Sequence, residues 1–338
     1  MNSVFRPTTI RDEARIVEFL TRVFSLGRDA PFVDPPLLRW KYWEPRADCP
    51  DPRAFAMERD GRIVAHAGLW PVTVRDGAKS RRGRHMIDWA SDPGAPGAGV
   101  SLLQRLTKSY DFVYSIGGSE MTQAILPKFG FRVVAEALTW ARPIRPWRQM
   151  PRHQNRDWRL PARLARNILW SLTPPRVAER GWAAVESGAG GAEGLAALAR
   201  ERDESFFAYL QRCPMARSLT FRLEHEGRKA GFLALSIVRE QARVAGVWLE
   251  NPSPENWRAA FHLAQDAALK RTGACEIVAR GATAAGAAGA EQAGMRLRER
   301  TPVFLFRKDS GAEPLPLQFQ MSDNDSAFLG ERSAGFLT

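Results

Sequence analysis

Residues 85–131 constrain the fold of this chain more than any other stretch of its sequence. The stretch opens with a short apolar run at 85–90, whose length suits a buried strand. A turn rich in glycine and proline follows at 92–99, and leucines at helical spacing come next. A second strand-like run at 111–116 leads into a helix that we expect to end at Gly130. The sequence therefore predicts a strand, a glycine turn and a helix, followed by a second strand and helix.

Such a glycine turn is suited to hold a phosphate group. Glycines let backbone amides approach an anion because no Cβ stands in the way. The start of the following helix adds unpaired N–H groups and a partial positive charge. A P-loop is excluded because its Gly-Lys-Ser/Thr ending is missing, and a Rossmann fingerprint has a wider glycine spacing with an acid about 20 residues further on. The alternative is an ordinary strand-to-helix turn rich in Gly and Pro.

The stretch resembles the GNAT superfamily of acyl-CoA transferases, whose pyrophosphate loop reads Arg/Gln-x-x-Gly-x-Gly/Ala before a helix. Gly97-Ala98-Gly99 followed by Leu102-Leu103 matches this loop, and Gly130-Phe131 matches the Gly-Phe that follows the family's next helix. The chain departs from the family at Gly94, where Arg or Gln is usual. The resemblance implies that acetyl-CoA or another acyl-CoA is the co-substrate, with no metal, and that its binding residues are Trp89, Ala90, Ser91, Gly94, Gly97, Ala98, Gly99, Val100, Ser101 and Ser119.

Three side chains are candidates for the general base of an acyl transfer to an amine. The resemblance implies direct attack of an amine on a thioester, with a backbone N–H of residues 89–91 polarising the carbonyl group. His85 has an intrinsic pKa suited to proton transfer, Asp88 lies on the same predicted strand, and Glu120 begins the next helix. By strand alternation we expect His85 and Asp88 on opposite faces, so that at most one of them faces the site.

Two residues in the second helix depart from the family. The Tyr that commonly acts as general acid stands four residues before the Gly of Gly-Phe, and this position is Leu126 here. The Asn that often binds CoA near the start of that helix corresponds to Ser119. The sequence therefore offers no side chain to protonate the thiolate that leaves.

The sequence also repeats itself with an offset near 160 residues, which indicates a duplicated fold. Five pairs of motifs occur in the same order in both halves. They are 37–40 with 206–209, 49–50 with 213–214, 60–62 with 226–228, 88–93 with 247–252, and 130–132 with 294–296.

The second copy departs from the first at its turn and its last helix. The turn at 251–256 has no glycine and carries Glu255, which would repel phosphate. A low-complexity run at 281–289 occupies the position of the last helix, and we expect it to replace that helix. We therefore expect the second lobe to be structural or to shape the substrate site, without binding CoA.

Composition narrows the class of protein and its partners. The net charge of +12 and a pI near 10.3 favour anionic partners, such as CoA, acidic polysaccharide, nucleic acid or anionic lipid. Three scattered cysteines are too few for a disulfide framework or a zinc site. No run is long enough to span a bilayer, and the N-terminus shows no signal-peptide pattern, so we expect a cytoplasmic protein.

Residues 143–180 form a basic segment between the two copies. Leu164, Ile168 and Leu172 recur at helical spacing within it. We expect these three to pack on a lobe, with at most a weak anionic-surface contact through 145–180; a membrane-binding amphipathic helix is the alternative. The segment holds Arg145, Arg148, Arg152, Arg156, Arg159, Arg163, Arg166, Arg176 and Arg180, against Asp157 and Glu179.

The tail contains a strand-like run at 317–321, followed by a further candidate site at 322–326. Its two aspartates can bind a cation or a basic substrate group, although we expect a solvated turn.

These observations predict an α/β (α+β) protein of two tandem GNAT-like lobes, each a mixed, mostly antiparallel sheet flanked by helices. The predicted boundaries are an acyl-CoA-binding lobe at 1–145, a basic linker at 146–180, a degenerate lobe at 181–308 and a tail at 309–338. The resemblance implies an N-acyltransferase with an amine acceptor, by analogy an amino sugar or cell-envelope precursor. No nucleic acid partner is expected. The alternatives are an aminoacyl-tRNA-dependent transferase of the Fem type and a non-catalytic scaffold.

Overall fold

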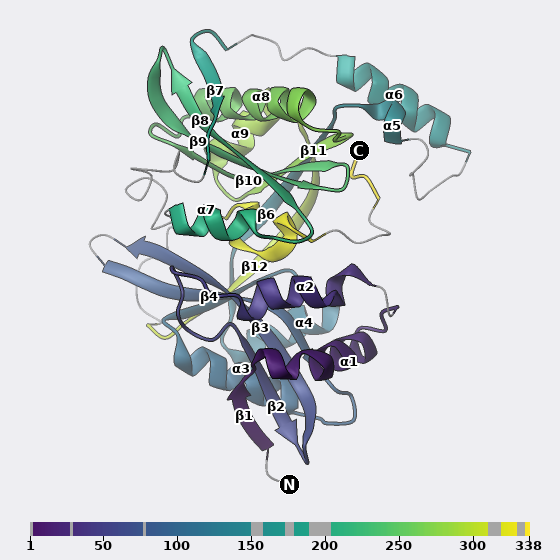
Figure 1. Cartoon of the computed structure of the whole chain (residues 1–338), viewed down its shortest axis with the longest axis vertical. Helices are drawn as coiled ribbons and strands as arrows, with labels where there is room; N and C mark the ends of the chain where they lie inside the picture. The colour runs from purple at the N-terminus through teal and green to yellow at the C-terminus, as the bar shows by residue number, and fades with distance from the viewer. Residues whose placement is uncertain are drawn as a thin grey trace. The chain divides into compact units, whose positions relative to one another are not determined.

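The computed structural model describes residues 3–27, 30–76, 79–149, 158–172, 179–188, 204–309, 319–329 and 335–338. The chain divides into two compact units (Figure 1). Unit 1 comprises Met1–Glu136, Thr301–Leu317 and Asp323–Asp325, and unit 2 comprises Ala137–Arg300, Gln318–Ser322 and Ser326–Thr338. Among the described residues, none of the helices is both long and apolar enough to cross a membrane.

Unit 1 is built on a mostly antiparallel sheet with the strand order β1-β2-β3-β4-β5-β12. All neighbours in this order are antiparallel except β4 and β5, which run parallel. The strands are β1 (Ser3–Pro7), β2 (Ala54–Arg59), β3 (Arg62–Asp76), β4 (Lys79–Ser91), β5 (Phe112–Ile116) and β12 (Arg296–Arg307).

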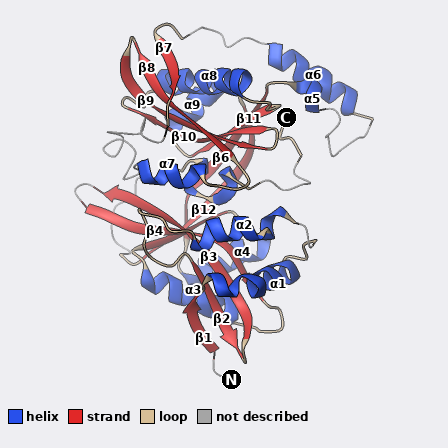
Figure 2. Cartoon of the chain, in the orientation of Figure 1, coloured by secondary structure: helices blue, strands red, loops and turns tan. Residues whose placement is uncertain are grey.

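Helices cover both faces of the unit 1 sheet, and each face has its own apolar core (Figure 2). On one face Ile16, Phe19 and Leu20 of α1 are buried, at the three- and four-residue spacing of an amphipathic helix. On the other face Leu102 and Leu106 of α3 are buried. The helices and helical turns are η1 (Ile10–Asp12), α1 (Glu13–Val23), η2 (Pro31–Val33), α2 (Pro35–Leu38), the π-helical turn η3 (Arg39–Trp43), α3 (Ala98–Ser109), α4 (Glu120–Ile125) and η4 (Leu126–Phe129).

Unit 2 repeats this plan with the strand order β7-β8-β9-β10-β11-β6, again with one parallel pair, β10 and β11. The strands are β6 (Arg132–Pro143), β7 (Trp182–Glu186), β8 (Arg217–His225), β9 (Arg228–Val238), β10 (Gln241–Leu249) and β11 (Glu276–Gly281). The helices are α5 (Pro146–Gln149), α6 (Leu160–Leu172), α7 (Glu204–Gln211), α8 (Pro254–Arg271) and α9 (Ala284–Gln292).

The turns confirm the duplication. Asp60-Gly61 and Glu226-Gly227 both have positive φ at each residue, 49° and 74° in the first turn and 51° and 74° in the second. This conformation matches the twist of a two-residue hairpin. Gly130 and Gly294 also correspond, because each follows the last helix of its copy with φ of 85° and 76°.

The two copies exchange their last strands. From its sequence, the strand-like run at 133–142 is expected to close the first sheet. The strand exists as β6, but from Leu138 onward it pairs with β11 in unit 2. Strand β12 of the second copy pairs instead with β5 in unit 1. A strand's side-chain pattern specifies the faces that it buries and not which of two equivalent edges it joins. The boundaries at 145, 180 and 308 describe the copies along the sequence and stay a prediction.

The low-complexity run of the second copy folds into a helix, which corrects the expectation that this helix is lost. Thr283 caps α9 by accepting a hydrogen bond from the N–H of Gly286 at 3.1 Å. A Cβ on Gly289 would lie 2.4 Å from the Cβ of Trp257 in α8. The small residues are therefore needed because they let α9 pack closely on α8.

Helix α6 packs in a different orientation from the expected one. Asn167 and Trp170 form its buried face, whereas Ile168 and Leu172 are exposed and Leu164 is half-buried. The expectation that Leu164, Ile168 and Leu172 pack together on a lobe is therefore wrong. Of the basic residues in the segment, Arg152, Arg156 and Arg176 lie outside the described residues.

The tail turn is buried, so the expectation of a solvated turn is also wrong. Asp323 and Asp325 lie in two short 3₁₀ turns, Met321–Asp323 and Asp325–Ala327, and both aspartates are buried. The strand expected at 317–321 is reduced to a single bridge between Gln320 and Gly281, and residues 317–318 lie outside the described residues.

Candidate active site

The parallel strands of unit 1 part at the level of His85. The β4–β5 ladder runs from Gly83 opposite Phe112 to His85 opposite Tyr114. Beyond this point β4 continues to Ser91, while β5 continues to Ile116 and is paired with β12 on its other side. Among the described residues, the last residues of β4 therefore pair with β3 only, and no strand occupies their other edge.

A β-bulge interrupts β4 within this unpaired part. The register with β3 shifts between His66 opposite Ala90 and Gly68 opposite Ile87. Asp88 lies in the bulge with φ of 52°, in the left-handed region that non-glycine residues rarely adopt. Bulges of this kind redirect a side chain and often lie beside functional sites.

The bulge corrects our expectation that His85 and Asp88 lie on opposite faces. His85 stacks on Tyr114 with ring centroids 4.7 Å apart, and the Tyr114 hydroxyl donates to the carbonyl of Asp323 at 2.9 Å. Asp88 reaches the same tail turn through Lys41, which contacts both Asp88 and Asp325. The extra residue of the bulge cancels the alternation, so both side chains lie on one face.

A buried charge cluster surrounds Asp88. The ammonium group of Lys41 lies 2.5 Å from a carboxylate oxygen of Asp88 and 2.6 Å from one of Asp325. The Tyr42 hydroxyl donates to Asp88 at 2.5 Å. His66 is fully buried beside Tyr42, and its Nδ1 lies 3.4 Å from the Asp88 carbonyl oxygen. We call Lys41, Tyr42, His66, Asp88 and Asp325 the Lys41 cluster.

The cluster shifts the pKa values of Lys41, Asp88 and His66 in definite directions. Burial alone would lower the pKa of Lys41, but the carboxylates of Asp325 and Asp88 outweigh it and raise that pKa. Burial and the Asp325 charge raise the pKa of Asp88, against the effect of Lys41. Burial lowers the pKa of His66 to about 4, so this imidazole is neutral near neutral pH. One cation thus faces two buried carboxyl groups.

The predicted glycine loop lies at the start of α3. Gly97 is the N-cap residue, with φ of 81°, and no side chain caps the helix. The N–H groups of Ala98 and Ser101 bond to Ala95 and Gly97 carbonyls, whereas no such acceptor is found among the described residues for the N–H groups of Gly99 and Val100. The first turn of α3 therefore presents free amides and a partial positive charge.

Side chains around this loop are held by contacts of their own, and Gly99 itself is buried. Asp92 would repel a phosphate, but it pairs with Arg22 at 2.6 Å and accepts the N–H of Gly94 at 2.9 Å. Trp89 is turned onto the loop, where its indole N–H donates to the Gly99 carbonyl at 3.1 Å. A Cβ on Gly99 would lie 2.9 Å from the Ser91 side chain. Gly99 is therefore required for the close approach of α3 to the end of β4.

The remaining candidates lie around α4. Ser119 caps that helix by accepting the N–H of Thr122 at 3.2 Å, and Glu120 is exposed in its first turn. Leu126, at the position of the family's Tyr, is fully buried in the core under α3. Nε2 of His85 accepts the N–H of Ile116 at 3.3 Å. The loop residues, Trp89 and His85 thus gather at the parting of β4 and β5, while Asp88 is engaged by the Lys41 cluster.

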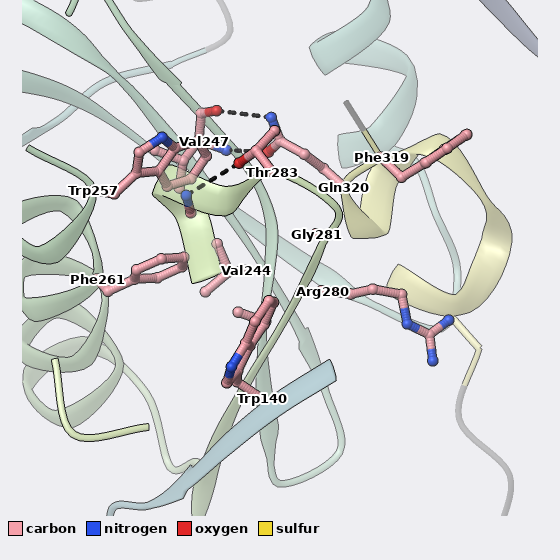
Figure 3. Close-up of a pocket in the computed structure, with 12 residues that line it drawn as sticks. Trp140, Val244, Val247, Trp257, Phe261, Arg280, Gly281, Thr283, Phe319 and Gln320 are labelled. Atoms are coloured by element: carbon pink, nitrogen blue, oxygen red, sulfur yellow. Dashed lines mark hydrogen bonds between the residues drawn. The ribbon is translucent and has the colours of Figure 1, made fainter. Parts of the chain in front are cut away.

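The equivalent place in the second copy is filled by the protein itself. The β10–β11 ladder ends at Val244 opposite Ala279. Beyond it the side-chain amide of Gln320 accepts the N–H of Val247 at 2.5 Å and donates to its carbonyl at 2.8 Å (Figure 3). The small pocket beside it is lined mainly by apolar and aromatic side chains, among them Trp140, Trp257 and Phe261.

The start of α8 likewise differs from that of α3. Ser253 is its N-cap residue and accepts the N–H of Asn256 at 3.3 Å, and Glu255 stands in the first turn. These groups satisfy an amide and place negative charge where α3 has neither. The structure therefore supports the expectation that the two copies differ at the turn.

The sequence reading missed most of the Lys41 cluster. Lys41 and Tyr42 stand within an aromatic run, and the only local signal was a charged residue between Trp40 and Tyr42. The π-helical turn η3 buries these three consecutive residues, which an ordinary helical turn would not do. No linear signal joined Asp325 to Lys41, because the contact spans most of the chain.

Comparisons with known proteins agree with this geometry. No family model matches the sequence, and no curated protein matches it. A GCN5-related N-acetyltransferase from Anabaena variabilis is similar in structure, with 10% identity and a TM-score of 0.59 over 90% of this chain and 72% of that one. A tandem GNAT protein from the clavulanic acid biosynthesis pathway is also similar, with 13% identity and a TM-score of 0.58 over 90% of this chain and 98% of that one. A GCN5-related N-acetyltransferase from Kribbella flavida has 12% identity and a TM-score of 0.56 over 91% of this chain and 72% of that one. The chain has the GNAT fold in a tandem arrangement, as the sequence predicted.

Proposed function

We propose that this chain is an N-acyltransferase that uses acetyl-CoA or another acyl-CoA and binds it on unit 1. The observation that carries the proposal is the first turn of α3, whose free amides lie beside the unpaired edge of β4. Free amides at a helix start hold phosphate groups. The open space at Gly97, where a Cβ would meet no atom within 4 Å, fits a ligand that approaches the backbone closely.

Each part of the site has a role in this proposal. The amides of Gly99 and Val100 would hold the pyrophosphate, and a backbone N–H of residues 89–91 would stabilise charge that develops on the thioester oxygen. The bulge sets the direction of that edge, and Lys41 and Tyr42 hold Asp88 within it. Asp88 is thus proposed as a positioning residue. The thioester supplies the activated acyl group, and an amine would attack it directly.

Proton transfer from the amine is assigned to His85 or Glu120. His85 lies where the strands part, but its Nε2 lone pair already accepts an N–H. Glu120 is exposed, so its carboxylate oxygens are accessible to a substrate or a bound water. Asp88 is less suited, because Lys41 and Tyr42 occupy its oxygens.

Thiol release from acetyl-CoA in the presence of a panel of amines tests the proposal. We expect amine-dependent release, with kcat lowered about 10²- to 10⁴-fold by the variant that removes the base, His85→Gln or Glu120→Gln. Asp266→Asn, an exposed carboxylate on α8, is the matched control and should leave kcat unchanged. Normal kcat in both test variants would refute this assignment of the base. Absence of release with every amine, despite CoA binding, would argue against an enzyme and for a binding protein.

A further inference from the structure

Helix α6 belongs to unit 2 (Figure 1) and carries an exposed apolar face. Leu169 and Leu172 are 70% and 69% exposed, Ile168 is 39% exposed, and Trp158 just before the helix is 83% exposed. Positions 161, 165, 168, 169 and 172 recur at intervals of three and four, so they share one side of the helix. All five residues on this side, Pro161, Ala165, Ile168, Leu169 and Leu172, are apolar and exposed. We call them, with Trp158, the α6 face.

The opposite side of α6 is fixed to unit 2, so the α6 face is held outward. Asn167 donates to Gln149 at 3.1 Å, and Gln149 donates in turn to Thr338 at 2.8 Å. The indole N–H of Trp170 donates to the Gly294 carbonyl at 2.8 Å, and the guanidinium of Arg296 stacks 4.3 Å from the Trp170 ring. These contacts exclude a simple rotation of the helix that would bury its leucines.

Positive charge borders the α6 face. Arg166 is exposed beside it, and the Arg159 guanidinium lies 5.0 Å from the Trp158 ring centroid. Helix α6 itself contains no acidic residue. Over 143–172 the sequence has seven arginines, at 145, 148, 152, 156, 159, 163 and 166, against the single acid Asp157. An apolar face with a basic border and an exposed Trp is the pattern of a helix that lies in a membrane interface.

We propose that the α6 face binds the surface of an anionic phospholipid bilayer, with Trp158, Leu169 and Leu172 inserted among the lipids. A second copy of the chain fits the face less well, because pairing two such faces brings like charges of Arg159 and Arg166 together. A bilayer with anionic headgroups can bury the apolar side chains among its acyl chains and pair its negative charge with the bordering arginines. From the sequence we expected only a weak contact with an anionic surface, because we expected the leucines of this helix to be buried. Leu172 is exposed, so that reason does not hold.

Vesicle co-sedimentation of the full chain tests this proposal. The vesicles are phosphatidylcholine alone and phosphatidylcholine mixed with phosphatidylglycerol, each at low and at physiological salt. We expect binding to the mixed vesicles that persists at physiological salt. Leu169→Gln with Leu172→Gln should weaken it about tenfold or more, since both side chains leave the apolar layer. Arg159→Gln with Arg166→Gln should weaken it about tenfold, mainly at low salt.

Leu269→Gln is the matched control, because Leu269 is an exposed leucine on α8 of the same unit and is not part of the α6 face. This variant should bind vesicles as the unchanged chain does. Circular dichroism of each variant confirms that it is folded. The proposal is overturned by absence of binding to the mixed vesicles, by binding that vanishes at physiological salt, or by binding that the leucine variants leave intact. A dimer that the leucine variants dissociate, without vesicle binding, would assign the face to a second copy.

Discussion

Replacing Lys41 by methionine is expected to lower the free energy of unfolding by about 3–5 kcal/mol, because it leaves buried carboxyl groups without their cation. Lys41 is almost fully buried and contacts both Asp88 and Asp325. Urea unfolding followed by circular dichroism measures the loss. Lys108→Met, on the exposed side of α3, is the control and should change stability by less than about 0.5 kcal/mol.

The pH dependence of this variant follows from the same charges. Without Lys41, the folded-state pKa of Asp88 rises further above its unfolded value. The folded state then binds more protons than the unfolded state, so stability is present at acidic pH and is lost as pH rises through the folded pKa. The deficit of Lys41→Met should therefore be smaller at acidic than at neutral pH. Adding Asp88→Asn and Asp325→Asn should recover most of the stability, and a deficit that these changes leave intact would contradict the ion-pair account.

Valine at Gly97 is expected to abolish CoA binding, with a loss beyond measurement by calorimetry. Gly97 has φ of 81° and open space where its Cβ would lie, so a side chain there would enter the region proposed for the pyrophosphate. Valine at Gly99 should do the same, although its Cβ also approaches Ser91 at 2.9 Å and some stability will be lost.

Gly227→Val is the matched control for backbone strain. Gly227 has φ of 74° and equally open space, but it lies in the hairpin turn between β8 and β9. Its substitution imposes a similar conformational strain, on the order of 1–2 kcal/mol, and should leave CoA affinity unchanged. Equal affinity in the Gly97 variant and the unchanged chain would remove the basis for placing CoA at this loop.

Local sequence patterns were enough to predict the strand, glycine turn and helix of the first copy and the duplication of the fold. The helical spacing of the leucines in α3 depends on neighbouring residues alone, and the structure confirms that they form one buried helix face. The repeated motifs then predicted two copies of one fold, which the matching strand orders confirm.

The features that the sequence did not predict depend on contacts between distant residues or on local irregularities. The exchange of β6 and β12 needs knowledge of which sheet edge is available. The bulge at Asp88 inserts one residue and reverses an inference that assumed strict alternation. On α6, apolar residues occupy the outer face. The inner face carries Asn167, which donates a hydrogen bond to Gln149, and the sequence alone does not show that these two residues meet. Apolar periodicity therefore identified the helix but not its orientation.

The measurement that most directly tests this account is the stoichiometry of CoA binding by isothermal titration calorimetry. The free amides at the start of α3 have no equivalent at α8, where Ser253 caps the helix, and Gln320 bonds to the edge of β10. The account predicts one CoA per chain, no binding in Gly97→Val and full binding in Gly227→Val. Absence of binding, or a second equivalent that survives Gly97→Val, would contradict the assignment of acyl-CoA to unit 1.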